Sequence, residues 1–113
     1  MYYIGIDISK FKHDCAVIDD SGEIVTPSWS FTNDAEGFSQ LKLLLNSLDT
    51  ETRIGLESTG HYGMNLKLFL ESNNFSFMEF NPLLINRFVK SKSLRKTKSD
   101  SIDCMMIAHY LMT

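Results

Sequence analysis

Cysteine and long hydrophobic runs are both scarce in this sequence, and each scarcity excludes a class of protein. The two cysteines, Cys15 and Cys104, form no CxxC pair and cannot build a disulfide framework, so a reducing, intracellular setting is expected. No apolar run approaches the roughly 18 residues that a membrane-spanning helix requires. The first residues lack the basic start and the cleavage site of a signal peptide. The sequence therefore predicts a cytoplasmic protein.

Internal repeats and low-complexity tracts are also missing, and the composition is that of an ordinary globular protein. Of the 113 residues, 43% are hydrophobic and 22% are charged. A chain of this length can bury a sizeable core as one unit. We therefore expect residues 1–113 to form a single domain.

A strong net charge is absent as well. The formal net charge of −3 argues, on average, against a polyanionic partner. The average hides a local excess, because residues 87–98 carry six basic residues and no acid. These basic residues are Arg87, Lys90, Lys92, Arg95, Lys96 and Lys98. Clustered cations of this kind bind a phosphate backbone, and Phe88 among them would add base stacking, although a solvated surface loop would have the same composition.

The hydrophobic pattern predicts three strands followed by alternating helices and strands. The expected strands span residues 2–7, 13–19, 23–31, 53–57 and 75–80. The expected helices span residues 35–48 and 62–71, with a short one after residue 83, an exposed loop up to residue 98, and a last helix from Ser99. Pro27 places the third strand at an edge of the sheet. This order predicts an α/β fold with a mixed five-stranded sheet and helices on both faces, which resembles the ribonuclease H-like fold.

Four acidic residues occupy positions from which they could converge. Asp7 and Glu57 each follow an apolar run directly, at the ends of two expected strands. If these strands pair in parallel, both carboxylates emerge at one edge of the sheet. Asp100 and Asp103, three residues apart, would share one face of the last helix. Carboxylates suit Mg²⁺ or Mn²⁺, and such ions can neutralise the charge that develops in phosphodiester cleavage, so the four acids are predicted to be metal ligands and catalytic residues.

Each acid taken alone also has a structural explanation. Asp7 would form an ion pair with a nearby lysine, Glu57 would accept hydrogen bonds from the following loop, and the two later acids would favour a helix N-terminus. Asp14, like the other acids around the N-terminal strands, is expected to be solvated. His61 either lines the site or is an ordinary exposed histidine. Only the combined placement of the four acids favours a site.

Three segments resemble the motifs of the DEDD-type insertion-sequence transposases, the group that includes the Piv-type DNA invertases. The opening motif is matched by residues 4–10 (IGIDISK), and the second motif by residues 57–62 (ESTGHY). Asn81 and Pro82, followed by residues 96–103 (KTKSDSID), are similar to the third motif. Cys104 departs from the pattern, since many members have alanine there, but this change removes no carboxylate.

The resemblance implies a RuvC-like N-terminal domain of a recombinase that acts in DNA transposition. It implies that Asp7, Glu57, Asp100 and Asp103 bind the metal. Family members also carry a C-terminal domain with a nucleophilic serine, which these 113 residues do not include, so the fragment is expected to be inactive alone. Some members are guided by a structured RNA, and members assemble as homo-oligomers. DNA, a guide RNA and further copies of the chain are therefore the expected partners, in the nucleoid of a prokaryotic cell.

Three alternatives remain open on the sequence. A Holliday-junction resolvase of the same fold would use the same acids without a serine domain. A fragment of a sugar-kinase or actin-like ATPase would also begin with Gly5-Ile6-Asp7, although residues 9–12 (SKFK) are a poor phosphate-binding turn. A non-enzymatic nucleic-acid-binding module would need only the basic segment.

Overall fold

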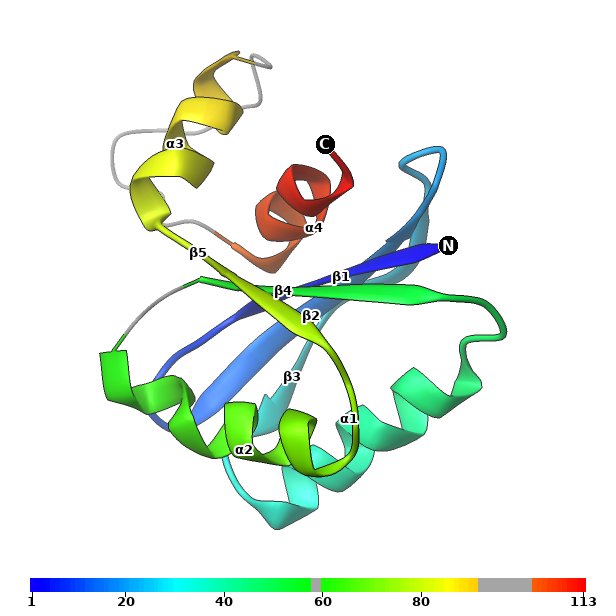
Figure 1. Cartoon of the computed structure of the whole chain (residues 1–113), viewed down its shortest axis with the longest axis vertical. Helices are drawn as coiled ribbons and strands as arrows, with labels where there is room; N and C mark the ends of the chain where they lie inside the picture. The colour runs from blue at the N-terminus through cyan, green and yellow to red at the C-terminus, as the bar shows by residue number, and fades with distance from the viewer. Residues whose placement is uncertain (58–59, 92–102) are drawn as a thin grey trace.

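The computed structural model describes residues 1–57, 60–91 and 103–113, which form the elements shown in Figure 1. The strands are β1 (Tyr2–Asp7), β2 (Lys12–Asp19), β3 (Ile24–Thr32), β4 (Thr52–Glu57) and β5 (Phe77–Phe80). The helices are α1 (Ala35–Ser47), α2 (Met64–Ser72), α3 (Pro82–Ser91) and α4 (Cys104–Met112), with a 3₁₀ turn η1 (Gly60–Gly63) before α2. Among these described helices, none has the length and apolar character needed to cross a membrane.

The strands form a mixed sheet in the order β3-β2-β1-β4-β5. β1 is antiparallel to β2 and parallel to β4, and β4 is parallel to β5. Pro27 lies on β3 at the edge of the sheet, as its missing N–H predicts. The observed sheet confirms the α/β prediction and is consistent with a ribonuclease H-like fold.

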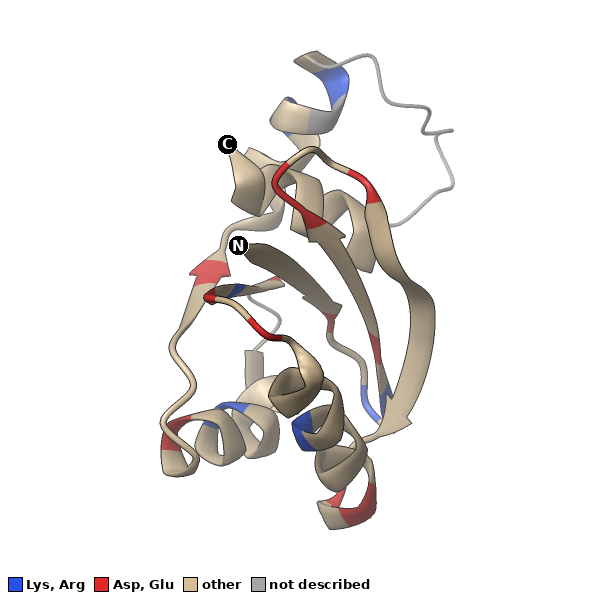
Figure 2. Cartoon of the chain, turned by 90° about the vertical axis from the view of Figure 1, so that its right-hand side faces the viewer, with Lys and Arg blue, Asp and Glu red and all other residues tan. Residues whose placement is uncertain are grey.

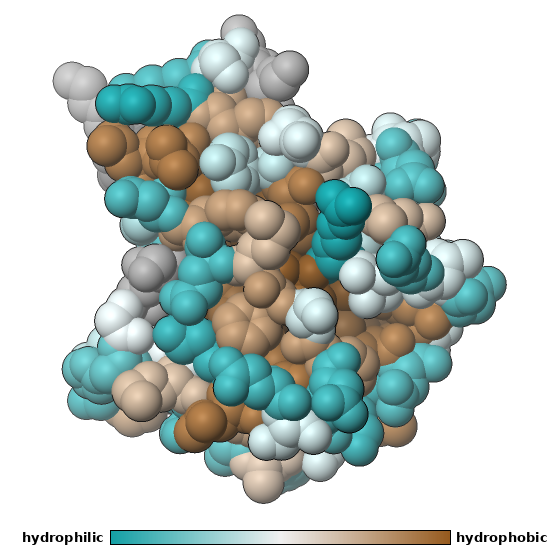
Figure 3. Space-filling view, in the orientation of Figure 1, coloured by the Kyte–Doolittle hydropathy of each residue, from teal (hydrophilic) through white to brown (hydrophobic). Residues whose placement is uncertain are grey.

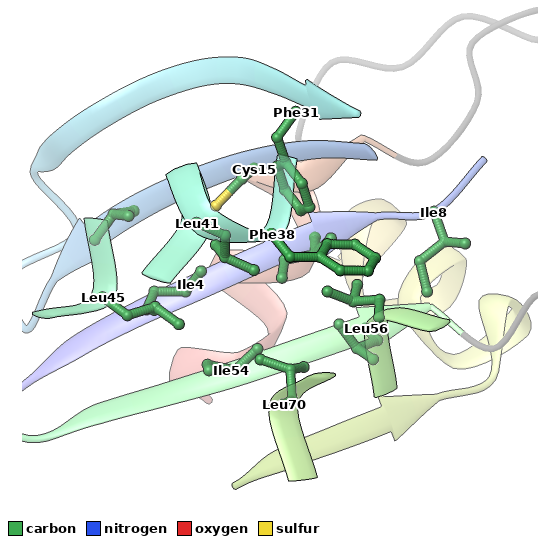
Figure 4. Close-up of a cluster of buried hydrophobic side chains, with 13 residues drawn as sticks. Ile4, Ile8, Cys15, Phe31, Phe38, Leu41, Leu45, Ile54, Leu56 and Leu70 are labelled. Carbon is green, nitrogen blue, oxygen red and sulfur yellow. The ribbon is translucent and has the colours of Figure 1, made fainter. Parts of the chain in front are cut away.

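Helices cover both faces of the sheet: α1 and α2 lie on one side, and α4 lies on the other with α3 packed against it (Figure 1). Because side chains alternate along a strand, Ile4 and Ile6 of β1 point towards α1 and α2. There they join the main hydrophobic core, shown in Figure 4. Other fully buried members of this core include Leu56 of β4, Leu41 of α1, and Leu66 and Leu70 of α2. The same alternation turns Gly5 and Asp7 towards α4.

α4 packs directly on the backbone of β1, and Gly5 makes this approach possible. A Cβ atom at Gly5 would lie 2.1 Å from the carbonyl oxygen of Cys104 and 2.5 Å from the backbone nitrogen of Ala108. A glycine inside a strand often marks such a close backbone approach. The contact places the first turn of α4, and the residue before it, beside the carboxyl end of β1.

Candidate functional site

Asp7 and Glu57 stand next to each other at the carboxyl ends of β1 and β4. The parallel register pairs Ile6 with Leu56, so the following residue on each strand is one of the two acids. Both side chains are half-buried, and both belong to the sheet face that α4 covers. The parallel pairing expected from the sequence is therefore confirmed, and it brings these two carboxylates to the same edge.

Asp103 reaches this edge from α4, but not in the way that the sequence predicted. It has an extended backbone (φ −108°, ψ 171°) and is the N-cap of α4, where its Oδ1 accepts a hydrogen bond of 2.9 Å from the N–H of Met106. The prediction that one helix runs from Ser99 through Asp103 is therefore wrong, because the helix begins only after the capping residue. Asp100 lies outside the described residues.

Asp14 is a further acid at the site, and the prediction that it is simply solvated is wrong. The antiparallel register of β1 and β2 places it directly opposite Asp7, where it is half-buried. The hydroxyl of Ser30, its partner on β3, donates a hydrogen bond to its Oδ1. The signal in the sequence was the hairpin itself, because directly opposed residues of an antiparallel pair share one face of the sheet.

The electrostatics of Asp7 show that these acids influence one another. Burial raises the pKa of Asp7 from its ordinary 3.8 to about 7, with additional increases caused by the charges of Glu57, Asp14 and Asp103. Both causes disfavour the charged form. A cation that binds at this edge would relieve the repulsion between the carboxylates, so their chemistry fits a hard divalent ion. Within the described ranges, however, no three carboxylate, imidazole or thiol groups are arranged so that they could hold one ion.

Cys104 follows the capping acid and is buried rather than reactive. Its thiol lies 3.3 Å from the hydroxyl of Ser28 on β3, and 1% of the residue is exposed. Burial raises the pKa of this thiol above its ordinary value, and the nearby acids raise it further. A neutral, buried thiol here fills space between α4 and the sheet.

The basic segment is described only in part. Arg87 and Lys90 are exposed on α3, the uppermost helix in Figure 1. Figure 2 shows the basic residues of this helix in blue. α3 is attached to α4 by Ile85, which is fully buried against Ile107, and by the edge-on contact of Phe88 with Tyr110. The remaining basic residues, Lys92, Arg95, Lys96 and Lys98, lie outside the described residues.

A hollow of about 450 Å³ adjoins the acidic edge and is lined by Glu79, Phe80, Asn81 and Pro82. It corresponds to the indentation below α3 in Figure 3. Phe80 pairs with Glu57 across β4 and β5, so the hollow begins beside one of the candidate acids.

His61 is exposed and packs against the ring of Tyr62, with ring centroids 4.5 Å apart.

Comparison with known proteins gives the family of this chain. A family model described as "Transposase", of the DEDD type and the IS110 group, matches residues 4–113. The chain belongs to this transposase family. It is also 33% identical over 111 residues to the pilin gene-inverting protein of Moraxella lacunata, an alignment that covers 96% of this chain and 33% of that protein.

Two further relatives of this transposase-family chain show the same partial coverage. The pilin gene-inverting protein of Moraxella bovis is 34% identical over 112 residues, which are 96% of this chain and 33% of that protein. The "Mini-circle putative transposase for IS117" of Streptomyces coelicolor is 28% identical over 115 residues, covering 98% of this chain and 27% of that protein. The chain thus spans a third or less of the length of the curated relatives that it matches.

Proposed function

We propose that this chain is the metal-binding part of a DNA transposase or site-specific recombinase. The observation that carries the proposal is the convergence of Asp7, Glu57 and Asp103 at one edge of the sheet, in a chain that belongs to a transposase family. Asp100 would be the fourth acid. The ion would be Mg²⁺ or Mn²⁺, which prefer carboxylate ligands. Family membership favours DNA strand exchange over the Holliday-junction resolvase, the ATPase and the purely binding module.

The residues would divide the work by their positions. Asp7 lies close to both of the other acids, because the charges of Glu57 and Asp103 both raise its pKa. It would therefore be the central ligand of the ion. The hydrogen bond from the N–H of Met106 fixes the orientation of the Asp103 carboxylate, which would therefore be ready to bind the ion. When bound, the ion supplies charge neutralisation at the phosphodiester oxygens.

We expect the partners to be nucleic acid and further copies of the chain. Arg87 and Lys90 on α3 would bind the phosphate backbone of DNA, and of a guide RNA where one is used, because cations make sequence-independent phosphate contacts. The attacking serine would come from a C-terminal domain that these 113 residues do not include. In the complete recombinase we expect a homo-oligomer that acts on DNA in the bacterial nucleoid, consistent with the bacterial relatives.

The metal site is tested by titrating Mn²⁺ into the chain in a calorimeter. We expect Asp7→Asn to weaken Mn²⁺ binding at least tenfold, because the central carboxylate is lost while the shape of the side chain is kept. The matched control is Asp20→Asn, since Asp20 is an exposed acid after β2, beyond the opposite end of that strand. Equal Mn²⁺ affinity in the two variants would sink the metal assignment.

Asp103 offers a way to separate capping from metal binding. Serine caps a helix about as well as aspartate, so Asp103→Ser should leave the free energy of unfolding within about 0.5 kcal/mol, whereas Asp103→Ala should lower it by about 1 kcal/mol. Both variants lose the carboxylate, and both should therefore weaken Mn²⁺ binding to the same extent. Urea denaturation and calorimetry on the same samples check the two effects. Full Mn²⁺ affinity in Asp103→Ser would show that Asp103 caps the helix and does not bind the metal.

The basic face of α3 is tested by the salt dependence of DNA binding. Arg87→Ala combined with Lys90→Ala should weaken binding to duplex DNA and reduce the slope of log K against log salt by about two, one for each lost phosphate contact. The control is Lys42→Ala, an exposed cation on α1 on the opposite face of the sheet. Fluorescence anisotropy at several salt concentrations measures both. An unchanged slope in the double variant would remove α3 from the nucleic-acid interface.

A further inference from the structure

His13 is a buried, ionisable residue that the proposed metal site does not use. It lies near the start of β2 and is completely inaccessible to solvent. Its ring meets Phe31 edge-on, with centroids 5.5 Å apart, on the side of the sheet that faces α1. A polar side chain buried this deeply needs hydrogen-bond partners, because an unsatisfied polar group costs about 1–3 kcal/mol.

The partners of His13 define its tautomer. The backbone N–H of Ser9 donates a hydrogen bond of 3.2 Å to Nδ1 of His13, so this nitrogen carries no proton and Nε2 carries it. Among the described residues, Nε2 of His13 and Oδ1 of Asn33 are the buried side-chain atoms without a hydrogen-bond partner. One is a donor and the other an acceptor. Burial lowers the pKa of His13, and Asn33 lies close enough to oppose this shift, so the two residues are polar neighbours.

Asn33 carries the connection to two other segments. Its Nδ2 donates to the carbonyl oxygens of Lys10 at 3.1 Å and Tyr62 at 3.4 Å. Its backbone N–H donates to the carbonyl oxygen of Phe11 at 2.9 Å. Asn33, which lies between β3 and α1, thus holds both the loop between β1 and β2 (residues 8–11) and the turn η1.

The same two segments also touch through apolar atoms. A Cβ atom at Gly63 of η1 would lie 2.8 Å from Cδ1 of Ile8, so the backbone of η1 lies directly against this side chain. Ile8 follows Asp7 in the sequence, and η1 begins three residues after Glu57. The segments that leave the two strand-end acids are therefore packed together.

We propose that His13 and Asn33 form a buried polar clamp that positions Asp7 and Glu57 relative to each other. The clamp combines two sets of hydrogen bonds made by neighbouring residues: the N–H of Ser9 donates to His13, and Asn33 donates to the carbonyl oxygens of Lys10 and Tyr62. It ties residues 8–11, which follow Asp7, to the turn η1, and so it sets the spacing at which the two carboxylates would meet an ion. His13 and Asn33 are positioning residues, and this role rests on the metal site proposed above.

Mn²⁺ affinity tests the clamp against a merely structural role. His13→Phe keeps a ring against Phe31 but removes the hydrogen bond from the N–H of Ser9. Asn33→Ala removes the side-chain hydrogen bonds to the carbonyl oxygens of Lys10 and Tyr62. We expect each variant to bind Mn²⁺ at least tenfold more weakly than the unmodified chain. The control is Phe38→Leu, a core change on α1 that lowers the melting temperature without touching the clamp. It should keep the affinity within twofold.

The outcomes separate the clamp from the metal site. If Asp7→Asn weakens Mn²⁺ binding while both clamp variants match Phe38→Leu, the clamp is overturned and the metal site stands. If Asp7→Asn has no effect, the metal site itself fails and the positioning role fails with it. Should His13→Phe not fold, Asn33→Ala decides, because Asn33 is only half-buried and tolerates truncation better.

A spectroscopic measurement on the unmodified chain gives an independent test. Imidazole ¹⁵N NMR at neutral pH should show His13 as the neutral tautomer with its proton on Nε2, and hydrogen exchange should show a protected Ser9 amide. A proton on Nδ1, or a rapidly exchanging Ser9 amide, would overturn the clamp whatever the metal titrations give.

Discussion

Gly5→Ala is expected to destabilise the domain by about 2–3 kcal/mol, which is the upper range for forcing extra atoms into a packed interior. The added Cβ would lie 2.1 Å from the carbonyl oxygen of Cys104 and 2.5 Å from the nitrogen of Ala108. These are backbone atoms of α4, so no side chain can rotate to make room and the whole helix must move. Urea denaturation, followed by circular dichroism, measures the loss in the free energy of unfolding.

Gly55→Ala is the matched control for this prediction. Gly55 is the partner of Gly5 on β4, but its Cβ would meet only side-chain atoms, the nearest being Cε2 of Phe80 at 3.0 Å. Side chains can shift by a few tenths of an ångström, so a loss below about 1 kcal/mol is expected. Equal losses in the two variants would show that direct backbone contact with α4 is not what makes Gly5 necessary. Because α4 carries Asp103 at its start, Gly5→Ala should also weaken Mn²⁺ binding.

Asp7→Asn is expected to stabilise the chain at pH 8 in the absence of divalent ions, while abolishing its metal response. The pKa of Asp7 is raised by burial and by the neighbouring acids to about 7, above its ordinary 3.8. Between these pH values the folded chain retains a proton that the unfolded chain has lost, so stability falls as pH rises from about 4 to about 7. The cost is complete above pH 7. Asparagine removes it, because it never ionises.

The size of this effect is moderated by solvent. A shift of about three pKa units corresponds to about 4 kcal/mol for a shielded group, and screening of the half-exposed carboxylate reduces the expected gain to about 1–2 kcal/mol. Denaturant titrations in EDTA at pH 8 and pH 4 provide the test, with Asp20→Asn again as the control. The gain should vanish at pH 4, where the folded form of the unmodified chain is also neutral at this position. A variant that is less stable at both pH values would contradict the account of Asp7.

A gain in stability together with a loss of metal binding would itself support a functional role for the acidic edge. Like charges gathered at half-buried positions oppose folding, and they persist where function requires them. Asp7 is opposed by Asp14 across the hairpin and flanked by Glu57 across the parallel pair, so no purely structural arrangement would choose these neighbours. The same measurement therefore bears on the fold and on the proposed function.

The acids at the strand ends could be found from the sequence because their signal is local. An apolar run that ends in an acid predicts a buried strand with a carboxylate at its exit, and this was sufficient for Asp7 and Glu57. The motif resemblance likewise rests on short segments, and the family match over residues 4–113 confirms it. Asp100 and four of the six basic residues lie outside the described part of the chain, so their roles stay predictions.

What the sequence by itself determined was the order of strands and helices, the edge position of Pro27, and the family, because each depends on residues that are close together in the chain. Only the tertiary structure decided that Asp14 faces Asp7, that Asp103 caps α4 and that Gly5 admits this helix. It also decided that His13 and Asn33 connect the loops behind the acids. These features depend on strand register and on the distance between backbones, which arise from contacts between residues far apart in the sequence. The candidate ligands of the proposed metal site are therefore visible in the local sequence, but only packing brings them together.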